Sequence, residues 1–346
     1  MNAEFVVPAD YAPVLNLKDT ERAIRLIKEF FQTNLAFELN LARVTAPLFV
    51  KAGTGINDDL NGVERPVAFR IKGMPGTGVE IVQSLAKWKR MMLADYGFLQ
   101  GEGLYADMNA IRPDEELDNL HSLYVDQWDW ERVMAPGERN LAFLETIVGK
   151  IYDVIRRTER YISYQYEHLE PILPETITFV HSAELEEQYP DVLPREREYR
   201  ACREYGAVFV IGIGGALKDG QPHDGRAPDY DDWSTPTSAG RAGLNGDILV
   251  YYPVLDCALE LSSMGIRVDP AALLNQLELT GNAARTELLF HRRLLAGELP
   301  QSVGGGIGQS RLCMFYLRKA HIGEIQASLW PDAMIQRCRE QQIALL

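Results

Sequence analysis

The chain has 346 residues, of which 46% are hydrophobic and 24% charged, a composition typical of a globular protein long enough for one large domain or two. Its formal net charge of −14 argues against a broad electrostatic grip on nucleic acid, and no apolar run reaches membrane-spanning length. The start lacks a signal peptide and the four cysteines form no Cys-x-x-Cys pair, so we expect a cytoplasmic protein that acts on small molecules, with neither nucleic acid nor membrane as partner.

A long amphipathic helix is predicted at the start of the fold. From Asp19 to about Leu35 the apolar side chains recur at helical spacing, and Asp19 or Thr20 can cap the first turn. Residues 42–50 are typical of a strand, and Pro47 places that strand at a sheet edge or an interface, because proline has no N–H to donate. This pair of elements would support a homodimer.

Further along the chain, short predicted strands do not alternate regularly with helices. The strands are expected at 67–71, 79–82, 123–127, 176–180, 207–213, 247–252 and 259–264. The helices are expected at about 85–95, 141–166, 270–279 and 286–295. This order favours an α+β fold, a largely antiparallel sheet flanked by helices, over a doubly wound parallel sheet. Without a visible repeat or linker, we expect one domain over 1–346, with 1–17 as an unstructured lead or a covering strand.

A glycine-rich stretch, Gly304 to Gly308, precedes Arg311 and an apolar helical run at 312–317. Glycine lets the backbone approach a ligand closely, and an arginine at the first turn of a helix adds positive charge beside amides that favour anions. The stretch therefore suggests a loop of a nucleotide site. It does not match the P-loop or the dinucleotide fingerprint, and the alternative is a tight turn that packs a helix against a sheet.

Polar side chains occur where a predicted strand should be apolar. Alternation along 123–132 places Val125, Gln127 and Asp129 on one face, and Tyr124, Asp126, Trp128 and Trp130 on the other. In a sheet covered by helices, Gln127 and Asp129 need polar partners or a ligand. The alternative is a solvated edge strand.

Two more clusters carry charge. Asp247 and Glu260 flank two predicted strands that could be neighbours, and paired carboxylates bind Mg²⁺, while the nearby Arg267 could clamp a carboxylate with its planar fork. The second cluster, at 84–90, contains Lys87 and Lys89 near the start of a helix. Surface ion pairs and a solvated basic face are the respective alternatives.

Taken together, these segments closely resemble the ammonia-dependent asparagine synthetases, the aspartate–ammonia ligases, whose core is that of class II aminoacyl-tRNA synthetases. The resemblance covers about 30–330. Its most specific blocks are Ser84 to Arg90, Tyr124 to Val133, Arg226 to Ser234 and Gly243 to Val250. The opening helix with Pro47 is similar to class II motif 1, which forms dimers, Arg112-Pro113-Asp114-Glu115 to motif 2, and Gly304 to Arg311 to motif 3. Synthetases usually have Glu before the last arginine, where this chain has Ser310, and no segment resembles their anticodon-binding barrel.

The resemblance implies roles for residues in ATP and aspartate binding. ATP would be held by Arg112, Ser122, Val125, Asp231, Asp247, Glu260, Ser263 and Arg311, with Mg²⁺ on Asp247 and Glu260. Aspartate and the reacting end would be held by Asp58, Lys89, Gln127, Asp129 and Arg267. Arg112, Arg311, Asp58 and Gln127 would be catalytic, with Asp58 as the base that deprotonates ammonium.

The implied reaction has two steps, in which ATP and aspartate give β-aspartyl-AMP and pyrophosphate, and ammonia then displaces AMP to give asparagine. No amino-terminal cysteine is present to hydrolyse glutamine, which fits free ammonia as donor. Two alternatives are a synthetase-like ligase that charges tRNA or modifies a protein, and a silent paralogue that serves as a regulatory subunit. The first predicts a basic docking surface, and the second predicts loss of Arg112, Asp247, Glu260 or Arg311, all of which are present.

Overall fold

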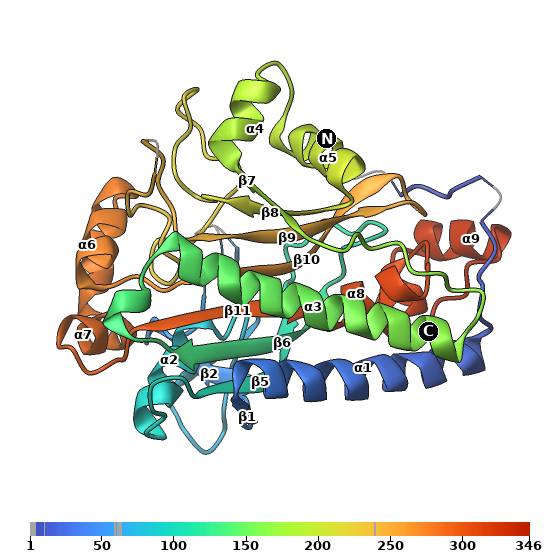
Figure 1. Cartoon of the computed structure of the whole chain (residues 1–346). Helices are drawn as coiled ribbons and strands as arrows, with labels where there is room; N and C mark the ends of the chain where they lie inside the picture. Colours follow the sequence, from blue (N-terminus) through green and yellow to red (C-terminus); the bar gives the residue numbers. More distant parts are fainter. Residues whose placement is uncertain (1–4, 10, 59, 61–63, 239) are drawn as a thin grey trace.

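The computed structural model describes residues 5–9, 11–58, 60, 64–238 and 240–346. Its centre is an eight-stranded sheet with the order β1-β5-β6-β11-β10-β9-β8-β7 (Figure 1). Five neighbouring pairs are antiparallel, and only the outer pairs β1–β5 and β7–β8 are parallel. The prediction of a largely antiparallel sheet flanked by helices is therefore confirmed. Within these described ranges, no helix has the length and apolarity to cross a membrane.

The sheet is built from segments far apart in the chain. Its strands are β1 (Leu41–Arg43), β5 (Gly103–Ile111), β6 (Tyr124–Val133), β7 (Thr178–His181), β8 (Ala207–Ile211), β9 (Asn245–Tyr252), β10 (Cys257–Ile266) and β11 (Ser302–Gly308). A small antiparallel sheet contains β2 (Phe49–Lys51), β4 (Gly78–Ile81) and β3 (Ala68–Arg70). The α-helices are α1 (Leu17–Leu39), α2 (Ala86–Asp95), α3 (Leu141–Gln165), α4 (Ser182–Gln188), α5 (Pro194–Tyr205), α6 (Pro270–Leu279), α7 (Leu289–Leu295), α8 (Gln309–Tyr316) and α9 (Asp332–Glu340).

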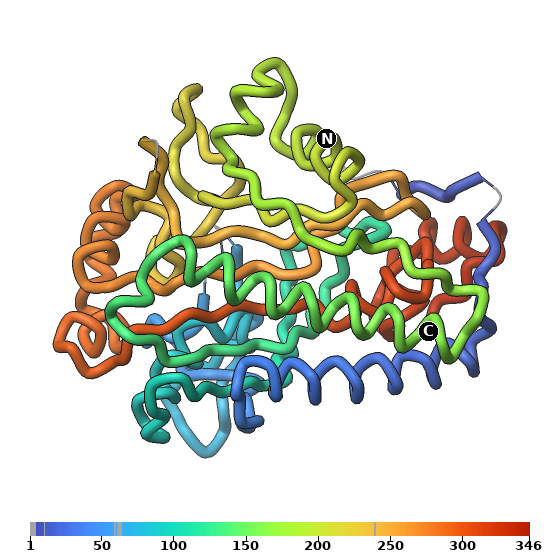
Figure 2. Tube along the Cα trace, in the orientation of Figure 1, coloured from blue at the N-terminus to red at the C-terminus, as the bar shows by residue number. Residues whose placement is uncertain are grey.

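One face of the sheet is covered by the long helices α1 and α3, which run side by side across it (Figures 1 and 2). Both begin with an asparagine cap, since the side chains of Asn16 and Asn140 accept backbone N–H groups of the first turns. Their apolar stripes meet Trp128 and Trp130 of β6 in the main core. The opposite face of β6 is thereby left to the polar side chains.

Two predicted elements differ from the structure. The glycine-rich stretch is not a loop but the strand β11, which pairs with β6 and β10, and only the helical part of the prediction, α8, is confirmed. Residues 42–50 do not form one strand, because the chain leaves β1 at Arg43 and enters the small sheet at Phe49, with Pro47 between the two. A proline cannot continue a ladder of backbone hydrogen bonds, so the strand is divided there.

Candidate active site

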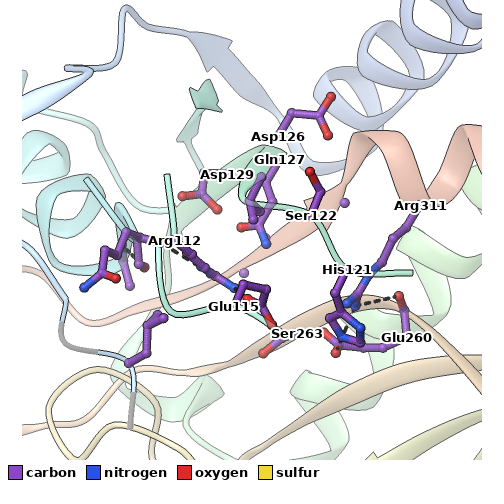
Figure 3. Close-up of a pocket in the computed structure, with 18 of the residues that line it drawn as sticks. Arg112, Glu115, His121, Ser122, Asp126, Gln127, Asp129, Glu260, Ser263 and Arg311 are labelled. Atoms are coloured by element: carbon purple, nitrogen blue, oxygen red, sulfur yellow. Dashed lines mark hydrogen bonds and ion pairs between the residues drawn. The ribbon is translucent and has the colours of Figure 1, made fainter. Parts of the chain in front are cut away.

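The exposed face of β6, β10 and β11 forms the wall of a cavity of about 360 Å³. Thirteen residues were assigned to the site from the sequence, and all of them except Asp58 and Asp247 line this cavity. Those that do are Lys89, Arg112, Ser122, Val125, Gln127, Asp129, Asp231, Glu260, Ser263, Arg267 and Arg311. They come from segments that the sheet brings together across most of the chain. In Figure 3, Gln127 and Asp129 lie between Arg112 and Arg311.

The glycines of β11 make the cavity possible. A Cβ on Gly306 would lie 2.4 Å from Gln127 Oε1 and 2.7 Å from Asp129 Oδ1, and a Cβ on Gly304 would overlap the carboxylate of Glu131. Since Cβ atoms do not approach neighbours so closely, only glycine leaves room for the polar row of β6. The glycines therefore serve close approach within a strand, not a phosphate-binding loop.

Lys89 brings a buried ammonium group to this row. It projects from α2, where Nζ donates to the carbonyl oxygen of Gly305 at 2.8 Å and lies 3.4 Å from Asp129 Oδ1. Burial lowers the pKa of Lys89, against the opposing effect of Asp129. Asp129 Oδ2 has no hydrogen-bond partner in the described part of the chain. A lysine and an unsatisfied carboxylate oxygen can together bind both ends of a small zwitterion.

Arg267 is held rigidly at the end of β10 by two carboxylates. Its Nε and Nη2 donate to Glu131, at 3.0 Å and 2.8 Å for the nearest oxygens, and its Nη1 donates to Asp231. All three side chains are buried. Burial would raise the pKa of Glu131, but Arg267 outweighs it and the pKa is lowered, so the pair is ionic. The guanidinium borders the cavity with its plane fixed, as recognition of a carboxylate requires.

Arg226 occupies the position between the cavity and Asp247. Its Nη2 donates to Asp247 Oδ1 at 2.6 Å, and its Nη1 donates to Ser263 Oγ. Burial raises the pKa of Asp247 to about 7, Arg226 opposes this, and the charge of Glu260 raises it further. The two strands β9 and β10 are neighbours as predicted, and the two carboxylates interact electrostatically. Such like charges favour a cation between them.

The two arginines of the predicted phosphate site are only partly buried. Arg112 follows β5, and its Nη2 donates to the Gln83 carbonyl oxygen at 3.3 Å. Arg311 lies on the first turn of α8, where Nη1 is 3.3 Å from Glu260 Oε2. About a quarter of each side chain is exposed. Both guanidiniums are therefore accessible to an anionic ligand from opposite sides of the cavity (Figure 3).

The predicted adenine contacts lie at the start of β6. Ser122 is buried and its Oγ donates to Ser328 Oγ at 2.8 Å, and Val125 lines the cavity on the same face as Gln127. Ile322 and Gln326, from the segment before α9, close this side of the cavity. This part of the wall offers an apolar surface with a few polar atoms, which suits a heterocyclic base.

Asp58 has a different place from the one expected beside Gln127 and Asp129. It lines a second cavity, and its Oδ1 is 3.6 Å from Lys87 Nζ. Its backbone oxygen accepts a hydrogen bond from Gln83 Nε2 at 3.0 Å. Because Gln83 lines the first cavity, Asp58 stands in the wall that separates the two.

Three residues at the first cavity have no role in the sequence prediction: Arg226 and Tyr230, which line it, and Glu131, which holds the lining residue Arg267. Glu131 is the next residue on the polar face of β6 after Asp129, so alternation extended by one step would have found it. Arg226 belongs to one of the family-like blocks, but no spacing rule relates it to Asp247. Tyr230, whose pKa is raised well above its usual value by burial and then by Asp58, has no local pattern that marks it.

The fold is that of class II aminoacyl-tRNA synthetases. Asparaginyl-tRNA synthetase from Pyrococcus horikoshii superposes with a TM-score of 0.67 at 16% identity, over 90% of this chain and 70% of that one. The enzyme of the same name from Entamoeba histolytica gives 0.63 at 14% identity, over 90% and 66%. At this identity the likeness concerns the fold alone.

Within that fold class, the chain belongs to the aspartate–ammonia ligase family. The family model "AsnA: Aspartate-ammonia ligase" matches residues 18–342. An aspartate–ammonia ligase of Parabacteroides distasonis is 59% identical over 341 residues, which cover 99% of both chains. Another from Clostridium perfringens is 57% identical over 340 residues, 98% of both. The resemblance seen in the sequence is thus confirmed over nearly the whole chain.

Proposed function

We propose that the protein makes asparagine from aspartate and ammonia with ATP, through a β-aspartyl-AMP intermediate, and releases AMP and pyrophosphate. The observation that supports the proposal is the near-complete match to aspartate–ammonia ligases, together with one cavity that is lined by the four cationic side chains Lys89, Arg112, Arg267 and Arg311. Lys89 and Arg311 come from the helices α2 and α8, and Arg112 and Arg267 directly follow β5 and β10 of the large sheet. Aspartate and ATP would therefore meet inside the same cavity.

In the first step, an oxygen of the aspartate β-carboxylate attacks the α-phosphorus of ATP, and the bond to pyrophosphate breaks. Lys89 and Arg267 hold the carboxylates of aspartate, and Gln127 and Asp129 bind its ammonium group and the reacting end. Arg112 and Arg311 offset the negative charge that builds up on the phosphoryl oxygens. Ser122 and Val125 contact adenine, while Asp231 and Ser263 complete the nucleotide pocket. Catalysis by such a site depends on positioning and fixed charge.

Asp247 and Glu260 would hold Mg²⁺. The raised pKa of Asp247 supports this, because a divalent cation offsets the repulsion between the two carboxylates. In the described part of the chain no three acidic, histidine or cysteine side chains gather as a metal site, so ATP phosphates and water would supply the other ligands. Bound there, Mg²⁺ would neutralise charge on the polyphosphate.

In the second step, ammonium loses one proton to the Asp58 carboxylate, and the lone pair of ammonia attacks the acyl carbon of aspartyl-AMP. The new C–N bond forms as the C–O bond to AMP breaks, and the second proton goes to water. Ammonia is mostly protonated near neutral pH, so a carboxylate that binds the cation and accepts a proton raises the supply of the nucleophile. Lys87 Nζ lies 3.6 Å from Asp58 Oδ1 and helps to hold this carboxylate in place.

We also infer a cytoplasmic homodimer. All four cysteines are free thiols, as is usual in a reducing compartment. Apolar side chains are exposed on and around the small sheet: Leu48 and Phe49 just after Pro47, Phe69 of β3, and Met74 in the turn after β3, each 41% to 49% exposed. An exposed apolar patch of this kind suits a subunit contact. Light scattering tests this, with Phe69→Glu expected to shift a dimer toward the monomer.

The Asp58→Asn variant tests the assignment of the two steps. It should keep aspartate-dependent ATP–pyrophosphate exchange, which reports adenylate formation, but lose asparagine formation by about 100-fold, as general-base removal does. Asp153→Asn is the matched control, because the Asp153 side chain is 64% exposed on α3 and pairs with Arg156 of the same helix. Unchanged asparagine synthesis in Asp58→Asn would refute the role of Asp58.

A further inference from the structure

A second cavity, of about 270 Å³, lies on the other side of Asp58 from the substrate cavity. Its wall is formed by the segment 51–58, Glu80 of β4, Lys87 of α2, Asp229, Arg285 and Leu288. Among the described residues the two cavities share no lining side chain. The second cavity is thus a separate opening that reaches the proposed base.

Asp58 is connected to both cavities. On the substrate side, Gln83 donates to the Asp58 backbone oxygen, and the phenol of Tyr230 feels the charge of Asp58 strongly enough to help raise its pKa after burial. On the other side, the Asp58 carboxylate lies 3.6 Å from Lys87, within the lining of the second cavity. A nitrogen bound at Asp58 would therefore lie close to the substrate cavity without having passed through it.

The floor of the second cavity contains a buried acceptor. Asp229 is fully buried. Its Oδ2 lies within hydrogen-bond distance of three groups: Lys87 Nζ at 3.2 Å, His291 Nε2 at 3.0 Å and Arg285 Nη1 at 3.2 Å. Burial would raise the pKa of Asp229, but these neighbours outweigh it and lower the pKa, so the carboxylate is charged. Asp229 Oδ1 has no hydrogen-bond partner in the part of the chain that the structure describes. A buried carboxylate oxygen of this kind needs a donor, and a small cation or water in the cavity would supply it.

We propose that the second cavity is the route and waiting site for ammonium on its way to Asp58. The inference rests on the proposed function. Once aspartate and ATP occupy the substrate cavity, the adenylate blocks that side, so the second nucleophile needs an opening of its own. Ammonium carries four N–H donors, and the acceptors here, Asp58, Asp229 Oδ1 and Glu80, suit it.

The charge balance of the cavity fits passage better than tight capture. Its acidic side chains, Asp58, Glu80 and Asp229, are matched by Lys51, Lys87 and Arg285. An excess of carboxylates would hold ammonium or an alkali cation strongly, whereas a balanced set allows ammonium to bind weakly and move on. At Asp58 the cation gives up one proton, and neutral ammonia proceeds to the acyl carbon.

A plug placed in this cavity tests the proposal. Thr54 is half-buried in the lining, and Thr54→Cys keeps a small side chain that methanethiosulfonate reagents can enlarge. We expect the benzyl adduct to raise the KM for ammonium at least tenfold, and the methyl adduct to raise it less. ATP–pyrophosphate exchange with aspartate should stay within twofold of the unmodified variant. The wild-type chain, treated in the same way, controls for reaction at the native cysteines.

A widened cavity provides the second, independent variant. A Cβ added to Gly55 would lie 2.7 Å from the side chain of Leu288, which shows how closely the two residues pack. Leu288→Ala therefore opens the wall of the second cavity at this point. Leu288→Ala should raise the use of methylamine relative to ammonium several-fold, with ATP–pyrophosphate exchange retained.

The proposal is overturned if a fully modified Thr54→Cys keeps the KM for ammonium, if exchange falls as much as amide formation, or if Leu288→Ala leaves the amine preference unchanged. Failure of the proposed function itself would be seen separately, as absence of exchange and of asparagine in the unmodified wild-type enzyme.

Discussion

Replacement of Glu131 by glutamine should be among the most damaging single changes in this site. Glu131 is fully buried and holds Arg267 along the Nε and Nη2 edge of its guanidinium, and Ser302 Oγ also donates to Glu131 at 2.7 Å. Glutamine has nearly the same shape but leaves the buried guanidinium with Asp231 as its remaining carboxylate. Removal of one partner of a buried ion pair costs about 3–5 kcal/mol of the free energy of unfolding.

Function should be lost together with stability in Glu131→Gln. The amide can accept only through its oxygen, so the guanidinium of Arg267 loses its fixed plane, and we expect the KM for aspartate to rise at least tenfold while the KM for ATP changes little. Urea unfolding measures the first effect and ATP–pyrophosphate exchange the second.

Glu175→Gln is the matched control for this change. Glu175 also pairs with two arginines, Arg156 and Arg160, but its side chain is 79% exposed. Its replacement should cost at most about 1 kcal/mol, since water screens exposed pairs. The reasoning would be refuted if the two variants lost similar stability, or if the KM for aspartate in Glu131→Gln stayed at the wild-type value.

Three further changes have expected outcomes. Gly306→Ala should abolish aspartate-dependent exchange, because its Cβ would overlap Gln127 and Asp129, whereas Gly149→Ala, with open space around it on α3, should leave activity unchanged; equal activities would contradict the steric account. Burial lowers the pKa of His321 from 6.5 to about 4, so the unfolded chain takes up the proton first and stability falls as pH drops through this window. In urea titrations between pH 7 and 4, His321→Gln should reduce the acid-induced decrease in the free energy of unfolding by up to about 3 kcal/mol. A pH profile equal to that of the wild type would exclude the mechanism. Burial raises the pKa of Cys257 to about 11, so thiol reagents should label it slowly at pH 7, which mass spectrometry can check, and rapid labelling would contradict its burial.

The local sequence pattern is sufficient to predict those helices and strands that have a strong hydrophobic periodicity. The apolar stripe of α1 and the long run of α3 predicted both helices closely, and alternation on β6 correctly separated Gln127 and Asp129 from Trp128 and Trp130. These features depend only on neighbours along the chain. Their side chains face either the core or a cavity, and the residue types record which.

Features set by contacts between distant segments were not predictable in the same way. The glycines of β11 predict a loop that approaches a ligand, whereas in the structure they form a strand whose neighbours on β6 and β10 leave no room for a Cβ. β5 (Gly103–Ile111) was not predicted at all. The separation of Asp58 from the substrate cavity also depends on a contact between separate segments. The side chain of Gln83, which precedes α2, donates a hydrogen bond to the backbone oxygen of Asp58. No spacing in the sequence encodes either relation.

The most direct test of the central claim is product formation from ATP, Mg²⁺ and aspartate, with ammonium present or withheld and with glutamine as an alternative donor. AMP, pyrophosphate and asparagine are followed by chromatography. The account predicts equal amounts of all three with ammonium, and no asparagine with glutamine alone. ATP left untouched in the presence of aspartate and ammonium would contradict it and favour a silent paralogue of the same fold.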